Sequence, residues 1–268
     1  MKRWVWAMTV GMVLTALAWG LLPLWKQAET APEPADTAAT PTPDAAPFSL
    51  LCVFTDGVQP TGMHLLQFEA TAATVTAIPA DARLAAGTVF TSASRLCTEG
   101  RLIELCAALE KQLEITIDNY AILSYDSYID LMQTHIGGVT LTLEADVPVP
   151  FIGNTLILSA GRQTLTPAQV VAYWRQSTDT LETAKRQGRV LSACLEIWLT
   201  AARREEWDEL FAALTNTAVT DWRVDRYAVQ RRTLWALSQR EEPLTVPFSL
   251  PAGEMVGEGA ARRFEFAD

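Results

Sequence analysis

The sequence predicts an α/β domain, with a central mixed β-sheet flanked by helices in three layers, preceded by one N-terminal transmembrane helix. Three observations lead to this fold class. Residues 4–25 form one uncharged apolar run, residues 26–47 are rich in Pro, Ala and Thr, and from Phe48 onward apolar segments of strand length alternate with amphipathic helical segments. About 220 residues follow Pro47, which is enough for one large domain.

The uncharged run from Trp4 to Trp25 is 22 residues long. At about 1.5 Å per residue it covers the roughly 30 Å hydrocarbon core of a membrane as a helix. Lys2 and Arg3 precede the run, so residues 1–3 are expected to be a cytoplasmic tip and the remainder to lie outside the cytoplasm. A cleaved signal peptide is the alternative, but its apolar core is usually about 7–15 residues long, and no clear cleavage site follows.

Residues 29–47 contain five prolines and no large apolar side chain, so residues 26–47 are expected to form a disordered linker. The net charge of the chain is −10, and the first 26 residues hold three basic and no acidic side chains, so the exported part is more acidic still. Nucleic acid is therefore excluded as a partner, because phosphate binding needs a basic surface.

Four cysteines have spacings that fit neither a zinc motif nor a small disulfide scaffold. Cys52 lies in an apolar strand, and Cys106 and Cys194 lie on apolar helix faces, which favours buried thiols. A bridge between Cys97 and Cys106 is the alternative, and it requires Cys97 to lie on a loop that folds back.

Strand-like segments begin with Phe48–Thr55, an almost wholly apolar run that ends at Asp56-Gly57. Residues 63–68 and 74–78 are separated by a short turn and are expected to pair as a hairpin. Residues 120–123 and 139–144 are two further predicted strands.

Helical segments follow from apolar spacing and from helix-capping residues. Residues 101–113 carry apolar side chains on one face, and residues 126–135 end at a pair of glycines. Thr166-Pro167 predicts a helix start for a segment that reaches Arg175, because Thr caps well and Pro costs little in the first turn. Three more helices are expected at 183–204, 205–214 and 221–237. The domain is expected to cover residues 48–240, followed by a tail at 241–268.

Four motifs occur in a fixed order: Ile136-Gly-Gly-Val-Thr140, Gly161-Arg-Gln-Thr-Leu165, Ala172-Tyr-Trp-Arg175 and Arg186-Gln187. In this order they resemble the LytR-CpsA-Psr family of membrane-anchored cell-envelope proteins. The resemblance covers about residues 48–240. It implies a phosphotransferase that moves a glycopolymer from a polyprenyl-pyrophosphate carrier to peptidoglycan, with an apolar cavity for the prenyl chain.

The resemblance also implies site residues. It places Arg175, Arg186 and Gln187 in the catalytic set, and it gives substrate binding to Asp81, Arg83, Arg175 and Arg189. Arginine suits this work because its planar donor fork binds phosphate oxygens and stays charged. Asp56 matches a family carboxylate that would bind Mg²⁺, although Asp-Gly is also an ordinary turn. The alternative for Arg186 and Arg189 is a solvated helix face.

Several family charges are replaced in this chain. An Arg-Ser-Asp segment is replaced by Gln59-Pro-Thr61, one arginine is replaced by Ala80, and two more are replaced by Ser177 and Thr183. Each lost contact to phosphate costs about 1–3 kcal/mol, so these replacements should weaken transfer. The alternative function is therefore a non-catalytic relative that binds carrier lipid or envelope glycan, or that positions an active partner.

The remaining chemistry-bearing residues give weaker signals. His64 and His135 have no metal-ligand spacing and are expected on strand and helix surfaces. Four of the nine tryptophans lie in residues 4–25, where interfacial tryptophan is expected. Trp198, Trp207 and Trp222 fit helix faces and are expected in the core. For Trp174, contact with lipid or sugar and core packing are both open.

Overall fold

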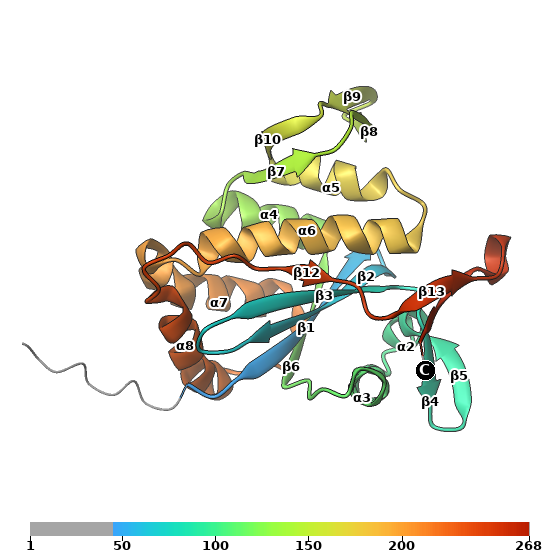
Figure 1. Ribbon diagram of the computed structural model, residues 1–268, viewed down its shortest axis with the longest axis horizontal. Coiled ribbons are helices and arrows are strands. Elements are labelled where there is room, and N and C mark those ends of the chain that lie inside the picture. The colour runs from blue at the N-terminus through green and yellow to red at the C-terminus, as the bar shows by residue number, and fades with distance from the viewer. Residues whose placement is uncertain (1–44, 268) are drawn as a thin grey trace, which may run out of the picture. The chain divides into compact units, whose positions relative to one another are not determined.

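The computed structural model describes residues 45–267 and shows an α/β domain built on a six-stranded mixed sheet (Figure 1). The strand order is β11-β6-β1-β2-β3-β12. The predicted fold class of the domain is confirmed. The predicted membrane span at 4–25 and most of the predicted linker lie outside the described residues. Within the described residues no helix is both long enough and apolar enough to cross a membrane.

The centre of the sheet is β1 (Phe48–Asp56), which lies between β6 (Asn119–Ser124) and β2 (Gln59–Phe68). β1 pairs with β6 in parallel and with β2 in antiparallel orientation, and β3 (Ala73–Pro79) completes the predicted hairpin with β2. Eight of the nine residues of β1 are buried. A strand covered on both faces is apolar along its whole length, which explains the continuous apolar run in the sequence.

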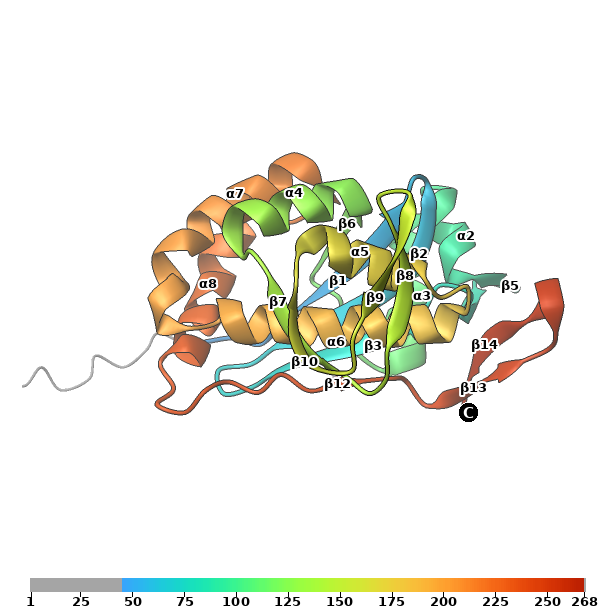
Figure 2. The ribbon, with the colours of Figure 1, turned by 90° about the horizontal axis from the view of Figure 1, so that it is seen from above.

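Helices cover the two faces of the sheet unequally (Figure 1). One face is covered by α2 (Ala93–Thr98) and α3 (Leu102–Leu113). The other face is covered by α4 (Tyr125–His135), α5 (Pro167–Arg175), α6 (Thr180–Trp198) and α7 (Trp207–Thr217). α6 runs across β2 and β3 (Figure 2), and its Gly188 lets the helix approach the sheet, since a Cβ there would lie 3.1 Å from Ala77.

Two helix boundaries follow from capping. α5 begins at Pro167 with Thr166 as its cap, as the sequence predicts. Gln169 completes a capping box, in which the side chains of Thr166 and Gln169 each accept a hydrogen bond from the other's backbone N–H. α6 begins at Thr180, three residues before the predicted start, because the Asp179 side chain accepts hydrogen bonds from Leu181 N and Glu182 N. α6 also ends early, at Trp198, and a 3₁₀ helix, η1 (Ala201–Glu206), leads into α7.

Several short elements were not predicted. They include three two-stranded sheets away from the central one, and the partner strand of the predicted β7 (Val139–Leu143). The three sheets are β4 (Arg83–Ala86) with β5 (Val89–Ser92), β8 (Val147–Phe151) with β9 (Asn154–Leu158), and β13 (Gly253–Val256) with β14 (Arg263–Phe266); β7 pairs with β10 (Gly161–Leu165).

The predicted tail is part of the packed structure. Residues of β12 (Phe248–Ser249) join the central sheet next to β3, and Phe264 of β14 is buried against the α2 and α3 side of the sheet. At the other edge, β11 (Val219–Thr220) pairs with β6, and α8 (Val224–Ser238) follows it. The sheet therefore recruits its outermost strands from the last fifty or so residues of the chain.

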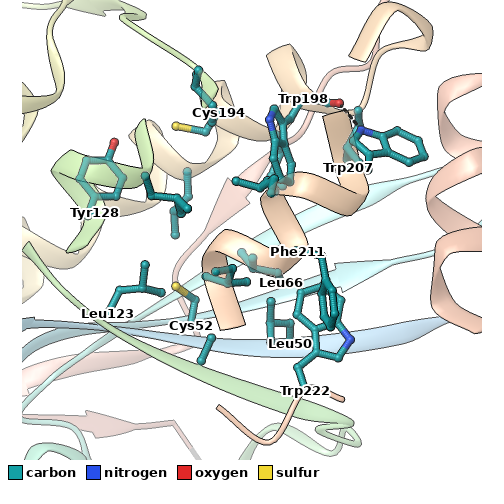
Figure 3. A pocket seen from close by; sticks show the side chains of 18 of the residues that line it. Leu50, Cys52, Leu66, Leu123, Tyr128, Cys194, Trp198, Trp207, Phe211 and Trp222 are labelled. Carbon is teal, nitrogen blue, oxygen red and sulfur yellow. Dashed lines mark hydrogen bonds between the residues drawn. The ribbon is translucent and has the colours of Figure 1, made fainter. Parts of the chain in front are cut away.

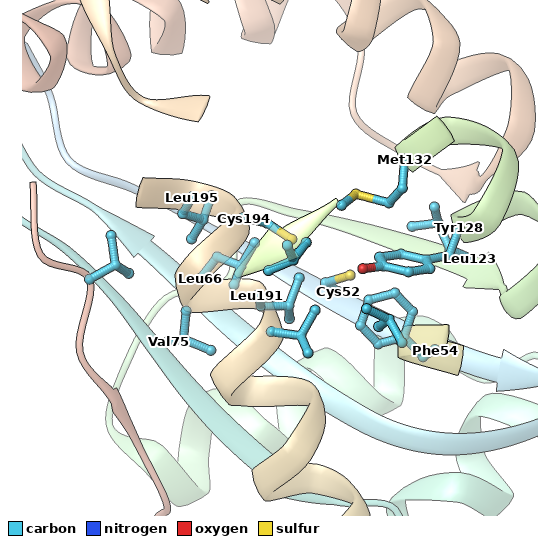
Figure 4. Close-up of a cluster of buried hydrophobic side chains, with 14 of the residues drawn as sticks. Cys52, Phe54, Leu66, Val75, Leu123, Tyr128, Met132, Leu191, Cys194 and Leu195 are labelled. Carbon is cyan, nitrogen blue, oxygen red and sulfur yellow. The ribbon is translucent and has the colours of Figure 1, made fainter. Parts of the chain in front are cut away.

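The buried apolar cluster between the sheet and α4, α5, α6 and α7 holds Cys52 of β1 and Cys194 of α6 (Figure 4). Both are buried free thiols, as expected. The Cys97–Cys106 bridge is not formed, because Cys97 lies on α2 rather than on a loop and both thiols are free. Both thiols are partly exposed, so the buried position predicted for Cys106 is wrong. Trp174, Trp207 and Trp222 are buried, whereas Trp198 is partly exposed.

The surface positions predicted for the two histidines are wrong. His64 is fully buried, because β2 is an inner strand and its face is covered by α6, and His135 is 9% exposed. Both ring nitrogens of His64 lack a hydrogen-bond partner among the described residues. Burial disfavours the charged imidazolium, and it lowers the pKa of His64 from 6.5 to about 3.

We expect His64 to make the domain sensitive to acid. At pH values between the pKa of His64 in the folded protein and its pKa in the unfolded chain, the unfolded chain binds up to one more proton than the folded protein. The free energy of unfolding therefore falls as the pH falls. The slope from this one group is up to about 1.4 kcal/mol per pH unit. His64→Leu should flatten the stability profile by that amount, as measured by urea denaturation at several values between about pH 6 and pH 4. Equal slopes for the two proteins would contradict the prediction.

We also expect Cys52 and Cys194 to be unreactive in the folded protein. Burial raises the pKa of each thiol to about 12, so little thiolate forms near neutral pH. Treatment with a thiol reagent at about pH 8, followed by mass spectrometry, should leave both residues unlabelled until urea is added. Labelling of the native protein at the rate seen in urea would show that these sites are accessible.

Candidate functional site

The C-terminal ends of β1 and β6 define the candidate site. Because these strands are parallel, Asp56 at the end of β1 and Tyr125 directly after β6 emerge at the same edge of the sheet. Open α/β sheets commonly bind ligands at this edge, outside the carboxyl ends of parallel strands. Arg175, the last residue of α5, reaches the same place.

Asp56 and Arg175 form a bidentate ion pair. Arg175 Nε donates to Asp56 Oδ2 at 2.8 Å, and Arg175 Nη2 donates to Asp56 Oδ1 at 2.7 Å. The hydrogen bonds from Arg175 hold the pKa of the Asp56 carboxyl below its usual value. Both side chains remain more than 40% exposed, so the pair faces solvent and contributes little stability. Asp56, the predicted metal ligand, and Arg175, the predicted phosphate-binding residue, are thus bonded to each other.

Beneath the ion pair lies a hydrogen-bonded group formed by Thr61, Tyr125 and Gln187. The Tyr125 hydroxyl donates to Thr61 Oγ1 at 2.8 Å, and Gln187 Nε2 donates to both oxygens at 3.0 Å. Thr61 Oγ1 in turn donates to the Phe54 carbonyl at 3.1 Å. Burial raises the pKa of Tyr125, so its hydroxyl stays protonated near neutral pH. The Arg175 guanidinium carbon lies 5.3 Å from the centre of the Tyr125 ring.

Gln187 is fully buried, so it positions neighbouring groups and does not face solvent. Its Oε1 has no hydrogen-bond partner among the residues described. The space for this oxygen exists because residue 62 is glycine: a Cβ on Gly62 would lie 2.0 Å from Gln187 Oε1. The position of the Gln187 side chain therefore depends on its close approach to the backbone of β2 at Gly62.

Arg186 is a clamp between two helices. Its guanidinium donates to the Tyr173 carbonyl at 2.8 Å and to Gln176 Oε1 at 2.6 Å, and it pairs with Glu182 at 3.2 Å. Its side chain is only 12% exposed. These contacts join the C-terminal end of α5 to α6, so the positive charge of Arg186 is already used within the protein.

The other predicted substrate-binding residues make no contact with this cluster among the hydrogen bonds and ion pairs of the described residues. Arg189 pairs with Glu144 at 3.1 Å, and Arg83 pairs with Glu265 of β14 at 3.0 Å. Asp81 is half-buried, burial raises its pKa, and its Oδ1 lacks a partner within the described part of the chain. The structure thus brings Asp56, Arg175 and Gln187 into one cluster and gives Arg83, Arg186 and Arg189 acidic partners elsewhere.

Two residues of the cluster were not identified as site residues from the sequence. In the sequence, Thr61 stands only where the family has an aspartate, and no motif marks Tyr125. The available signal for Tyr125 is its place at the end of a strand: Tyr125 directly follows β6, and Asp56 is the last residue of β1. Parallel pairing of the two strands, which brings these positions together, is not visible in a single sequence.

These residues do not fit a Mg²⁺ site as they stand. Mg²⁺ in proteins is held by one or two carboxylates together with phosphate oxygens and waters. Here one carboxylate is available, and Arg175 engages both of its oxygens; within residues 45–267 no group of three acidic, histidine or cysteine side chains is placed to hold a metal ion. We therefore derive no step through Mg²⁺.

An apolar cavity of about 150 Å³ lies between the sheet and helices α4, α6 and α7 (Figure 3). Its lining is almost wholly aliphatic and aromatic, and it includes Cys52, Tyr128 and Cys194. Trp207 closes part of the wall, with its indole N–H donating to the Trp198 carbonyl at 2.9 Å. The cavity has the character of a site for an apolar chain.

Comparison with known proteins gives one family and one fold. A model of the LytR_cpsA_psr family matches residues 88–255. No curated protein sequence matches the chain. Among solved structures, B. subtilis TagV superimposes with a TM-score of 0.68 at 16% identity, over 84% of this chain and 92% of TagV.

Two further structures are similar. A putative transcription regulator from Eubacterium siraeum has a TM-score of 0.71 at 16% identity, covering 84% of this chain and 89% of that one. TagT bound to LI-WTA has a TM-score of 0.65 at 18% identity, covering 82% of this chain and 85% of TagT; a further similar structure is that of B. subtilis TagT. At these identities the likeness establishes the fold.

We expect Gly62→Ala to destabilise the domain through Gln187. The added methyl group would clash with Gln187 Oε1 and force a shift in a packed interior, at a cost of about 1–3 kcal/mol. In a double-mutant cycle with Gln187→Ala, much of that cost should vanish, because the clashing atoms are gone. Urea denaturation of the four proteins gives the interaction energy, and additive effects would show that the two residues are independent.

Proposed function

The chain belongs to the LytR_cpsA_psr family, and we propose that its Arg175 site binds the pyrophosphate group of a polyprenyl-linked glycopolymer. The observation that carries this proposal is the arrangement of Arg175. Two of its donor groups are fixed by Asp56, and its side chain is 44% exposed at the edge of the sheet. A guanidinium has five N–H donors, so three remain for phosphate oxygens.

Support for the ligand class comes from the structural relatives. TagT is observed bound to LI-WTA and to LIIa-WTA. Arg175 would hold the pyrophosphate of such a carrier. We extend the proposal to residues 4–25 as the membrane anchor, which places the domain on the outer side of the cell membrane next to peptidoglycan; the uncharged run in the sequence supports this placement.

The geometry favours binding over transfer. Transfer forms a bond between an acceptor hydroxyl oxygen and phosphorus, and breaks the bridging P–O bond of the pyrophosphate, releasing polyprenyl phosphate. The hydroxyl proton needs a base, and the developing negative charge needs cations. Asp56 is a weak base because Arg175 lowers its pKa, and the charges of Arg186 and Arg189 are already paired. We therefore propose a carrier-binding protein in which the transfer step is slow or lost.

We predict that Arg175→Ala lowers the affinity for geranylgeranyl pyrophosphate by about 10- to 100-fold. This range corresponds to the loss of charged hydrogen bonds worth about 1.5–3 kcal/mol. Isothermal titration of the full-length protein, with either EDTA or Mg²⁺ present, measures the change. Arg162→Ala is the matched control, because Arg162 is an exposed arginine on β10 away from the ion pair.

Three outcomes bear on the proposal. Equal binding by wild type and Arg175→Ala would remove Arg175 from the site. Rapid release of polyprenyl phosphate from a polyprenyl-pyrophosphate-linked glycopolymer supplied with an acceptor glycan, followed by ³¹P NMR and abolished in Arg175→Ala, would instead establish the transferase. Binding that requires Mg²⁺ would return the metal role to Asp56.

A further inference from the structure

A group of four aromatic side chains separates the Arg175 site from the apolar cavity. It consists of Phe54, Tyr125, Tyr128 and Trp174. Phe54 and Tyr128 line the cavity, and Tyr125 carries the hydroxyl group that bonds to Thr61 and Gln187 at the site. Trp174 lies among the other three and is fully buried.

The ring distances show that Trp174 is in contact with both sides. Its ring centre lies 4.8 Å from Phe54 and 4.6 Å from Tyr128, on the cavity side, and 5.4 Å from Tyr125, on the site side. Trp174 immediately precedes Arg175 in α5. The buried ring and the residue that would hold phosphate therefore lie on the same helix turn. A single layer of rings therefore separates the two compartments.

The cavity is least covered at its other end. Its partly exposed lining residues are on the second half of α4, at the end of α6 and on α7: Leu131, Ile136, Trp198 and Leu214. Next to the Arg175 site, by contrast, Phe54 is 1% exposed and Tyr128 is 3% exposed. A prenyl chain whose pyrophosphate lies at Arg175 therefore meets Trp174 before it meets the cavity.

The position of Trp174 is held by packing and not by a hydrogen bond. Its indole N–H is buried and has no acceptor among the described residues. A buried donor without a partner destabilises the state that contains it, and nearly all buried N–H groups in proteins are bonded. The buried position of Trp174 thus carries a cost that a rotated side chain with a bonded N–H would avoid.

We infer that Trp174 is a gate between the phosphate site and the cavity, and that it determines whether the prenyl chain of a ligand contributes to binding. This inference rests on the proposed function, because it assumes that Arg175 binds the pyrophosphate. With Trp174 in place, the pyrophosphate is recognised and the prenyl chain stays outside the cavity. When the ring is removed, the two compartments join.

The test compares inorganic, geranyl, farnesyl and geranylgeranyl pyrophosphate as ligands of the full-length protein in lipid nanodiscs. For the wild type, affinities for the three prenyl ligands should agree within about threefold. For Trp174→Ala, affinity should rise about tenfold or more with each added isoprene unit that becomes buried, since each buried CH₂ group contributes about fourfold. The affinity for inorganic pyrophosphate should differ by no more than about twofold between wild type and Trp174→Ala.

Leu214→Ala is the matched control, because it enlarges the cavity at its partly exposed end without touching the aromatic group. It should keep the wild-type dependence on chain length. Trp174→Phe retains a ring in the core and should give an intermediate dependence if Trp174→Ala does not fold.

The inference is overturned if wild type already shows the steep chain-length dependence, or if Trp174→Ala and Leu214→Ala change it equally. Its failure is distinct from failure of the proposed function. If only the inference fails, pyrophosphate still binds in a manner that requires Arg175. If the proposed function fails, no ligand in the series binds in that manner, and both proposals fall.

Discussion

The parallel pairing of β1 with β6 is the constraint on which the candidate site depends. Six residues of each strand are in register, from Leu50 opposite Asn119 to Thr55 opposite Ser124. Parallel strands end at the same edge of a sheet, so Asp56 and Tyr125 are brought together although 69 positions separate them. Parallel pairs also need both faces covered. That need accounts for the helices on either side, and for the apolar surface that forms the cavity.

The charges of this chain are arranged mainly in internal pairs. Arg83, Arg186 and Arg189 each meet a carboxylate, and Arg186 also satisfies a helix-end carbonyl. In an acidic chain such pairing is readily available, and it leaves little positive charge for a ligand. Arg175 differs because its partner, Asp56, holds only one side of the guanidinium at an exposed edge. The site that results is specific in geometry and weak in total charge, which is why binding suits it better than transfer.

The long regular elements were predictable from the sequence, and the short ones were not. β1, the β2–β3 hairpin, α3, α4 and the capped start of α5 were anticipated because their apolar spacing or capping residues are local signals. The hairpins β4–β5 and β8–β9 and the two-residue strands β11 and β12 have little periodicity of their own, and their pairing partners define them. His64 was misplaced for a related reason: a histidine in a strand gives no sign that a helix will cover it.

The sequence by itself determined the α/β class, the order of the main elements, the family resemblance and the thinning of the family's charges, since each is written in local pattern or motif. Only the tertiary structure decided which charges remain available and where Trp174 lies. Asp56 and Arg175 are 119 positions apart, Thr61 and Gln187 are 126 apart, and Arg83 and Glu265 are 182 apart. The physical reason is that an ion pair or a ring contact depends on side chains meeting in space. That meeting is set by strand pairing and helix packing, and the spacing of residues along the chain does not reveal it.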